Sequence, residues 1–358
     1  MNASLEHTAR SAMEGRRLPP EEALSLTEHA RHRPHELLWW ASRVRASRFG
    51  NTVKLCSIAA GKLGGCGEDC RWCAQSAVAA PGVTRPSRTA TADIVSAARE
   101  AAANHAASFG IVNSGRHPSS RDLEEVESAV EEIRNPVGPS PAQICASLGE
   151  LTAGQARRLR RAGVTRYNHN LETSRRFFPR VVTTHTYDDR LATLTAARDA
   201  GLELCCGGLF GMGETWEDRV DLALTLRDEV RPKVVPLNFL HPIDGTPLAG
   251  VALLPPMEIL TIIALFRLVL PDADIKVAGG RERNLRDLQS WIFYAGATST
   301  LVGNYLTTTG RRASDDLRMI EDLGLRVVQR FDHEAEPSRT PALAEKGTQT
   351  TGAPPEGH

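Results

Sequence analysis

Apolar and polar positions repeat along the chain in one order: a short β-rich run, a polar turn, then a segment with helical periodicity. Between the strand-like runs lie amphipathic segments such as TADIVSAAREAAANHA, DLEEVESAVEEI and EDRVDLALTLRDEV. The strand-like runs are 52–58, 108–115, 142–149, 166–172, 202–211, 233–240, 274–280 and 299–304. About eight such units predict an α/β fold, a complete (β/α)₈ TIM-type barrel. A doubly wound open sheet is the alternative, although about six strands are more usual there.

The two ends of the chain differ from this repeat. Residues 1–50 predict an N-terminal helical extension, because PPEEALSLTEHA and PHELLWWASRVRASRFG each begin with proline followed by acidic residues. The barrel is expected to cover residues 51–330. Residues 331–358 are rich in Pro, Gly, Thr and Glu and have almost no large apolar side chains, which predicts a disordered C-terminal tail.

Charge and hydropathy narrow the possible partners. Lys+Arg and Asp+Glu are both 43, so the net charge is zero and no nucleic-acid partner is expected. The longest apolar run, 259–270, is interrupted by Arg267 and is too short to span a bilayer. The N-terminus also lacks the apolar stretch of a secretory signal. We therefore expect a cytoplasmic protein without a membrane partner, whose seven cysteines stay reduced for metal or redox chemistry.

The first chemical motif is GGCGEDCRWCAQS, residues 64–76, which follows the first predicted strand. Its cysteines are Cys66, Cys70 and Cys73. Three thiolates can hold three irons of a cubane cluster and leave the fourth iron open to a small molecule. The chemistry of a parallel barrel lies at the carboxyl ends of its strands, where this loop is expected. The alternatives are a zinc site with a distant fourth ligand and scattered buried cysteines.

With this loop and five further motifs, the sequence resembles the radical S-adenosylmethionine enzymes and, among them, the biotin synthase family. The further motifs are YNHNLETS (167–174), TTHTYDDRLATL (183–194), GGLFGMGET (207–215), VPLNFLHPIDGTPL (235–248) and TLVGNYLTTTG (300–310). They recur in order over most of the folded chain. YNHNLETS and NFLHPIDGTPL are more specific to the biotin synthase family than the cysteine loop is.

The resemblance implies a reaction and its partners. Cys66, Cys70 and Cys73 would hold a [4Fe–4S] cluster, and S-adenosylmethionine would bind its open iron and release a 5′-deoxyadenosyl radical. Because the radical forms on S-adenosylmethionine, no side chain is expected to be catalytic. The radicals would abstract hydrogens from dethiobiotin, and sulfur insertion would give biotin. The implied partners are a flavodoxin- or ferredoxin-type electron donor, the iron–sulfur assembly machinery and a second copy in a homodimer.

Polar residues of YNHNLE are candidates for binding. Asn168, Asn170 and Glu172 alternate, which places them on one face of a strand, where burial is unfavourable unless they bind something. The resemblance implies that Asn170 and Glu172 hold S-adenosylmethionine, and we expect Asn168 to contact the substrate. The family usually has aspartate at position 172.

Three further residues follow from the other motifs. Gly208, in a glycine run, permits close approach of the backbone to the cofactor, and Glu214 is expected to accept a hydrogen bond from it. Asn238 matches the residue expected to contact the ureido ring of dethiobiotin, because an amide both donates and accepts hydrogen bonds.

The sequence departs from the family at the expected sulfur source. The resemblance implies an auxiliary iron–sulfur cluster, which in the best-known branch of the family is a [2Fe–2S] cluster held by three cysteines and an arginine. Cys145 and Cys205 match two of the cysteines, but Gly110 stands at the third and Lys276 at the arginine. The usual auxiliary cluster therefore cannot form as such.

Another thiol offers a replacement ligand. Cys56, Cys145 and Cys205 lie on the first, third and fifth predicted strands, and odd-numbered strands contribute to the same interior layers. Cys206 has the opposite phase and is expected to face the helices. We hypothesise a three-cysteine auxiliary cluster with an extra sulfide, as in the family branch lacking the same two ligands. Otherwise Cys56 is a small buried apolar residue.

Two alternative functions remain at this stage. One is a related radical enzyme, a mutase or maturase that acts on another small molecule without inserting sulfur. The other is a non-catalytic zinc or iron–sulfur protein. Asn238 and the barrel cysteines argue against the first, because sulfur insertion requires a sulfur store, and the polar face of YNHNLE argues against the second.

Overall fold

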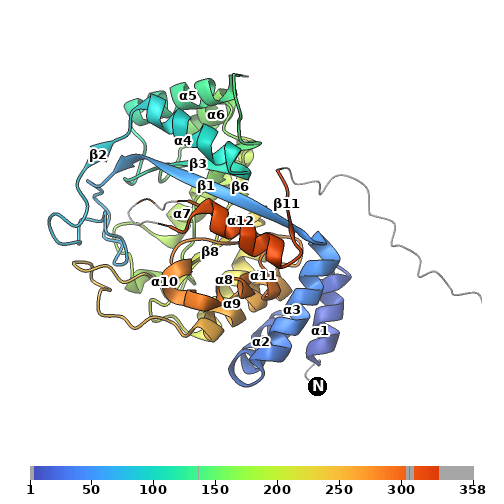
Figure 1. Ribbon diagram of the computed structural model, residues 1–358. Helices are drawn as coiled ribbons and strands as arrows, with labels where there is room; N and C mark the ends of the chain where they lie inside the picture. Colours follow the sequence, from blue (N-terminus) through green and yellow to red (C-terminus); the bar gives the residue numbers. More distant parts are fainter. Residues whose placement is uncertain (1–3, 136, 304–305, 307–309, 330–358) are drawn as a thin grey trace, which may run out of the picture.

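Eight parallel strands close into a barrel in the computed structural model, which describes residues 4–329 except 136, 304–305 and 307–309 (Figure 1). Its strands are β1 (Thr52–Leu63), β3 (Ala106–Asn113), β4 (Gln143–Ser147), β5 (Arg166–Asn168), β6 (Glu203–Cys205), β8 (Val234–Phe239), β9 (Asp274–Val277) and β10 (Ser299–Leu301). Closure comes from β1 and β10, where Lys54 pairs with Ser299 and Cys56 with Leu301. The predicted barrel is confirmed, and the open sheet is wrong.

Three short strands lie outside this ring of eight. β7 (Gly208–Phe210) follows β6 and pairs with β8. β2 (Ser87–Arg88) pairs antiparallel with the far end of β1, and β11 (Arg326–Val327) pairs with its beginning. The tail predicted for residues 331–358 lies outside the described residues.

Helices surround the barrel. They are α4 (Thr91–Ala103), α5 (Ser120–Arg134), α6 (Ala153–Ala162), α7 (Tyr187–Asp199), α8 (Trp216–Thr225), α9 (Pro256–Val269), α10 (Arg281–Leu285), α11 (Trp291–Tyr294) and α12 (Ala313–Asp322), with short helical turns η1 (Phe178–Arg180), η2 (Leu226–Val230) and η3 (Arg286–Leu288). Four consecutive helices, α5 to α8, begin with a reciprocal capping box at Ser119, Thr152, Thr186 and Thr215. The boxes fix where each loop at the carboxyl end of a strand stops.

The N-terminal extension forms three helices, α1 (Leu5–Met13), α2 (Pro20–His32) and α3 (Pro34–Phe49), which pack on α8 and α9. Because α9 is covered on both sides, all residues from Ile259 to Val269 are buried, which explains the long apolar run in the sequence. Arg45 joins the extension to the barrel by donating to the carbonyl oxygens of Ala297 (2.7 Å) and Thr52 (2.8 Å). Burial lowers the pKa of Arg45 to about 10.

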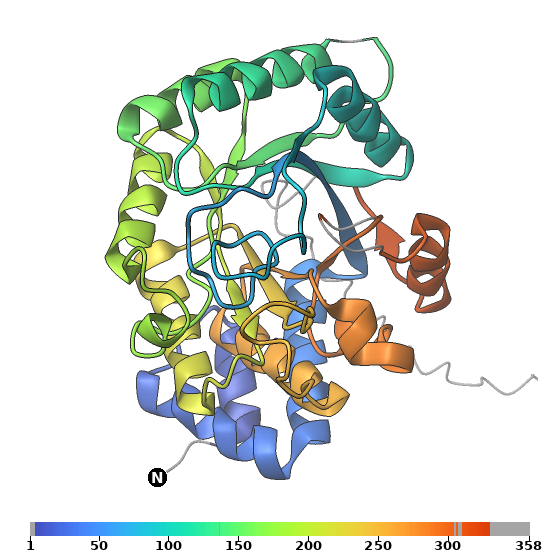
Figure 2. The same ribbon diagram turned by 90° about the vertical axis from the view of Figure 1, so that its left-hand side faces the viewer.

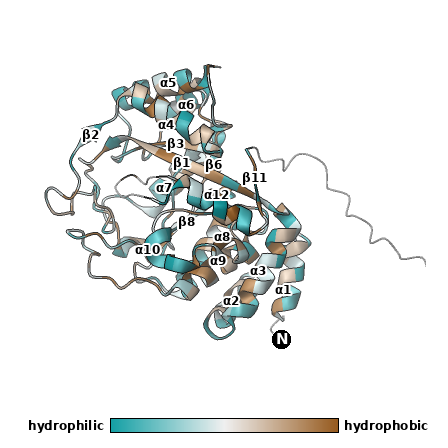
Figure 3. Ribbon diagram, viewed as in Figure 1, coloured by the Kyte–Doolittle hydropathy of each residue, from teal (hydrophilic) through white to brown (hydrophobic). Residues whose placement is uncertain are grey.

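Apolar side chains concentrate on the strands and on the inner faces of the helices. Figure 3 shows brown along β1, and both teal and brown on the helices around the barrel. In the described part of the chain, no helix has both the length and the apolar character needed to cross a membrane.

Asp122 is the main polar anchor between the start of α5 and the end of β1. Its carboxylate accepts hydrogen bonds from Ser119 N (2.8 Å) and Ser119 Oγ (2.8 Å), and it pairs with Arg88 (2.9 Å) and Lys62 (3.3 Å). Burial alone would raise the pKa of Asp122, but these partners lower it to about 2.

We expect Asp122→Ala to lower the free energy of unfolding by about 2 kcal/mol, because a helix cap and two ion pairs are lost together. The pKa of Asp122 in the folded state lies below its unfolded value of about 4, so the stabilisation by Asp122 is complete above about pH 4. It disappears as the pH falls toward 2. Urea unfolding at pH 7 and pH 3 measures both effects.

Glu125 supplies a control, because it also pairs with Arg88 but is more exposed. Glu125→Ala is expected to cost less than about 1 kcal/mol. Equal losses for the two variants would contradict the special role of Asp122.

Candidate functional site

A cavity of about 370 Å³ opens at the carboxyl end of the barrel strands. The loop after β1 lies across this opening (Figure 2). Of the residues predicted from sequence, eight line the cavity: Cys56, Cys73, Cys145, Asn168, Asn170, Glu172, Cys205 and Asn238. With the other lining residues, among them Val112, Lys276 and Leu301, all eight barrel units reach one space, as expected for a barrel enzyme.

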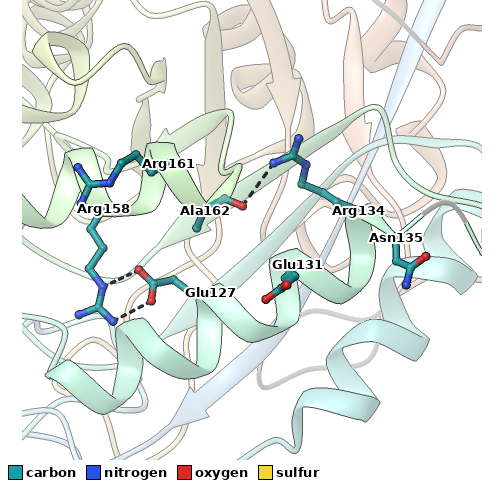
Figure 4. Close-up of a pocket in the computed structure, with 7 residues that line it drawn as sticks. All are labelled: Glu127, Glu131, Arg134, Asn135, Arg158, Arg161 and Ala162. Atoms are coloured by element: carbon teal, nitrogen blue, oxygen red, sulfur yellow. Dashed lines mark hydrogen bonds and ion pairs between the residues drawn. The ribbon is translucent and has the colours of Figure 1, made fainter.

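A larger hollow of about 820 Å³ lies elsewhere, on the outer surface between α5 and α6 (Figure 4). It is lined by charged side chains, and Arg158 donates to both carboxylate oxygens of Glu127 there. No strand contributes to it, and none of the predicted site residues lines it. Its size alone does not make it a functional site.

The cysteine loop is held in place by polar contacts at both ends. Gly64 and Gly65 have φ values of +66° and +62°, and Gly64 N donates to Gln75 Oε1 (2.8 Å). The Asp69 carboxylate accepts from Thr183 N (2.9 Å) and Thr184 N (3.2 Å). Burial alone would raise the pKa of Asp69, but these contacts lower it to about 2. The loop is therefore fixed to the segment before α7.

Cys66, Cys70 and Cys73 are half-buried, and the nearby thiols add to the raised pKa of Cys70. Burial raises the pKa values of the Cys70 and Cys73 thiols, and Gln75 N donates to Cys73 Sγ (3.4 Å). Among the described residues, no three Cys, His, Asp or Glu side chains are close enough for a single metal ion. A four-iron cluster holds each of its cysteines on a separate iron, so three cysteines on one loop suit such a cluster.

A buried network that the sequence did not predict connects the cysteine loop to YNHNLE. Glu68 contacts His185 Nδ1, and Arg190 Nε donates to His185 Nε2 (3.1 Å). Because Nε2 accepts, the proton lies on Nδ1 and is donated to Glu68. Burial, followed by the charge of Arg190, lowers the pKa of His185. Arg190 Nη1 also donates to the carbonyl oxygen of Asn170 (2.6 Å), which completes the connection.

The polar face of YNHNLE differs from the prediction. β5 ends at Asn168, so Asn170 and Glu172 lie in the following loop rather than on one strand face. Glu172 has a φ of +68°, and its carbonyl oxygen accepts from Leu209 N (2.7 Å). The three side chains nevertheless line the same cavity. Burial raises the pKa of the Glu172 carboxyl group, and Arg190, 3.9 Å away, acts in the opposite direction.

Asn238 lies on β8 with half of its amide already engaged. Gly279 N donates to its Oδ1 (2.9 Å), and its Nδ2 donates to the carbonyl oxygen of Gly208 (3.2 Å). One N–H and one lone pair remain for a bound molecule.

Gly208 and Glu214 do not line the cavity. A Cβ at Gly208 would approach Glu172 O to 2.9 Å, so glycine is needed where β7 packs against the loop after β5. The Glu214 carboxylate accepts from Gly211 N (3.0 Å), Met212 N (2.9 Å) and Arg219 Nε (3.0 Å). These partners all belong to its own loop and α8, and the expected hydrogen bond from the cofactor to Glu214 stays a prediction.

The floor of the cavity carries Cys56, Cys145 and Cys205, together with two cations. Lys276 Nζ lies 3.6 Å from Cys56 Sγ and 3.7 Å from Cys205 Sγ. Arg166 pairs with Cys145 in the β4–β5 register. Burial raises the pKa of Cys145 to about 12, against the effect of Arg166.

Two neighbouring positions, Gly110 and Cys206, add no further thiol to this floor. Gly110 pairs with Cys145 on the other side of β4, so the layer lacks a side chain where the family has cysteine. Cys206 is fully buried among core residues and does not line the cavity. The sequence analysis did not predict Arg166 as a site residue. Its charge at the first position of a barrel strand was a signal that could have identified it.

A closed (β/α)₈ barrel with three half-buried cysteines on the loop after its first strand defines the radical S-adenosylmethionine class. Residues 62–226 match the Radical SAM superfamily, and residues 236–326 match the Biotin and Thiamin Synthesis associated domain. The chain is 48% identical to a biotin synthase of Trichlorobacter lovleyi, over 91% of this chain and 97% of that relative. It is also 48% identical to a biotin synthase of Heliobacterium modesticaldum, over 91% and 99%. The chain belongs to the biotin synthase family.

Solved structures with little sequence similarity share the fold. A maturase of the [FeFe]-hydrogenase has a TM-score of 0.78 at 15% identity, covering 91% of this chain and 75% of that one. Methylornithine synthase has a TM-score of 0.76 at 20% identity, covering 90% and 97%. These similarities concern the fold alone.

Proposed function

We propose that the chain converts dethiobiotin to biotin by radical-mediated sulfur insertion, as a sulfurtransferase of the biotin synthase family. The observation that carries this function is the single cavity connecting Cys73 of the loop with Cys56, Cys145 and Cys205 at the floor. A reaction that joins radical formation to sulfur delivery requires both ends of such a cavity to face one substrate.

Cys66, Cys70 and Cys73 are proposed to hold a [4Fe–4S] cluster, which together with S-adenosylmethionine supplies the radical when bound. Asn170 and Glu172 line the cavity beside Cys73 and are proposed to orient S-adenosylmethionine. The network from Glu68 to Arg190 positions Asn170 relative to the loop.

The substrate is proposed to lie between these two ends. Asn238 would present its remaining N–H and lone pair to the ureido group of dethiobiotin, and Asn168 would contact the same molecule. Asn168 Nδ2 already donates to Cys205 Sγ (3.2 Å), so it links the substrate region to the floor.

Cys56, Cys145 and Cys205 are proposed to hold the auxiliary iron–sulfur cluster that donates sulfur. The donor set fits a three-cysteine cluster: three thiols face one cavity, and Gly110 leaves its layer without a fourth. Lys276 stands where the family has its arginine ligand, so the usual [2Fe–2S] cluster is not proposed.

The partners belong to the same proposal. The reaction needs electrons from outside the chain, which a flavodoxin- or ferredoxin-type protein would supply. The iron–sulfur assembly machinery would load both clusters, and the enzyme would work as a cytoplasmic homodimer.

Product analysis tests the function. Anaerobically reconstituted and reduced protein is incubated with S-adenosylmethionine and dethiobiotin, and we expect 5′-deoxyadenosine and biotin together. 5′-Deoxyadenosine without biotin would indicate a related radical enzyme with another substrate. Formation of neither product would contradict a radical function, provided that the iron content shows a loaded protein.

A further inference from the structure

Two cations at the cavity floor, the buried Arg166 and the half-buried Lys276, have no role in the proposed function. Lys276 Nζ lies within 3.7 Å of two sulfurs, Cys56 Sγ and Cys205 Sγ. Arg166 is only 3% exposed and lines the same cavity next to Cys145. The two cations therefore lie beside Cys56, Cys145 and Cys205 on different strands, β9 and β5. We call these three cysteines the cysteine trio. We call Arg166 and Lys276 the cation pair.

Arg166 has unused hydrogen-bonding capacity. Its Nη2 donates to Glu203 Oε2 (2.7 Å), a half-exposed carboxylate at the outer end of the side chain. Its buried Nε has no partner among the described residues. A buried guanidinium N–H without an acceptor is unfavourable, so a further anionic or polar group is expected beside it.

The charge of the trio explains why two cations are useful. Three thiolates outweigh the positive charge of an oxidised four-iron core, and an added sulfide makes the cluster more negative still. Buried anions require counter-charges nearby. This cavity supplies two such counter-charges, Arg166 and Lys276.

We infer that the cation pair forms an anion site for hydrosulfide and holds it as the extra sulfide of the auxiliary cluster. This inference rests on the proposed function. Binding would be an exchange in which HS⁻ takes the place of a water molecule at the site, with no change of oxidation state. Lys276 faces Cys56 and Cys205, Arg166 faces Cys145, and the anion lies between them.

Sulfide analysis tests the anion site without measuring activity. The protein is reconstituted anaerobically with iron and inorganic sulfide and desalted, and iron and acid-labile sulfide are counted per chain. Wild type is expected to contain about eight irons, in two four-iron clusters, and about one sulfide more than iron. Lys276→Met and Arg166→Gln are expected to keep the irons and lose the extra sulfide.

Two controls separate charge from structure. Lys276→Arg keeps the positive charge and is expected to retain the extra sulfide. Arg158→Gln removes a cation from the outer hollow of Figure 4, far from the cavity floor, and is expected to change nothing. Circular dichroism checks folding; Lys276→Gln replaces Lys276→Met, and Arg166→Met replaces Arg166→Gln, if the first variant does not fold.

The outcomes are distinguishable. If both neutral variants keep about eight irons and the extra sulfide, the anion site is wrong and the proposed function stands. Loss of the auxiliary irons together with the sulfide also overturns the anion site, because the cations then hold the cluster as a whole. If wild type holds only about four irons, the proposed auxiliary cluster is wrong and the anion site falls with it.

Discussion

Replacing Cys70 with serine is expected to lower the rate of 5′-deoxyadenosine formation by about a thousandfold, or ~4 kcal/mol. A serine hydroxyl stays protonated where a thiolate is needed, and the loop offers no other thiol besides Cys66 and Cys73. The iron content should fall by about four per chain. Chromatographic assay of 5′-deoxyadenosine and iron analysis of the same sample measure both effects.

Cys206→Ala is the control for Cys70→Ser. Cys206 is also a buried free thiol, but it packs in the core away from the cavity, so iron and product are expected to be unchanged. Equal losses of iron and 5′-deoxyadenosine in the two variants would show that removing any buried thiol has this effect, and that the loop has no special role.

Cys56→Ala is expected to separate the two halves of the reaction. Biotin formation should fall by about a hundredfold or more, ~3 kcal/mol, whereas 5′-deoxyadenosine is still produced. The reason is that Cys56 lines the cavity floor, whereas the cysteine loop after β1 is unchanged. Iron should fall from about eight to about four per chain.

The iron count also decides between two roles of Cys56. If Cys56 is only a small buried apolar residue, alanine replaces it with little effect, and about eight irons remain. That result would remove Cys56 from the auxiliary cluster. If Cys56 is a cluster ligand, Cys56→Ala and Cys70→Ser should each lose about four irons from a different cluster. A double variant that loses about eight irons would show that the two clusters are held independently.

The fold was predictable because each strand–helix unit carries a local signal. The alternation of apolar positions identified eight strands, and eight parallel strands close most easily as a barrel. The end of β5 was not predictable in this way. Alternation of Asn168, Asn170 and Glu172 continues past the strand, but the positive φ of Glu172 turns the backbone there.

The site was predictable where residues are close in sequence. The spacing of Cys66, Cys70 and Cys73 identified the loop, whereas Glu68 and His185 meet across 117 residues and carry no local signal. The donors to Glu214 show a related limit. Its backbone partners become evident only once the loop is folded, because the glycine-rich sequence does not show which N–H groups point toward the carboxylate.

The long strand β1 has a consequence for how the two ends of the cavity evolve. Cys56 lies within β1, and the loop with Cys66 begins directly after the strand ends at Leu63. An extended strand rises about 3.3 Å per residue and alternates its side chains. A one-residue insertion in β1 before Cys56 would therefore move the loop outward and also turn Cys56 toward the helices. The length of this one strand therefore sets the distance between the cysteine loop and Cys56.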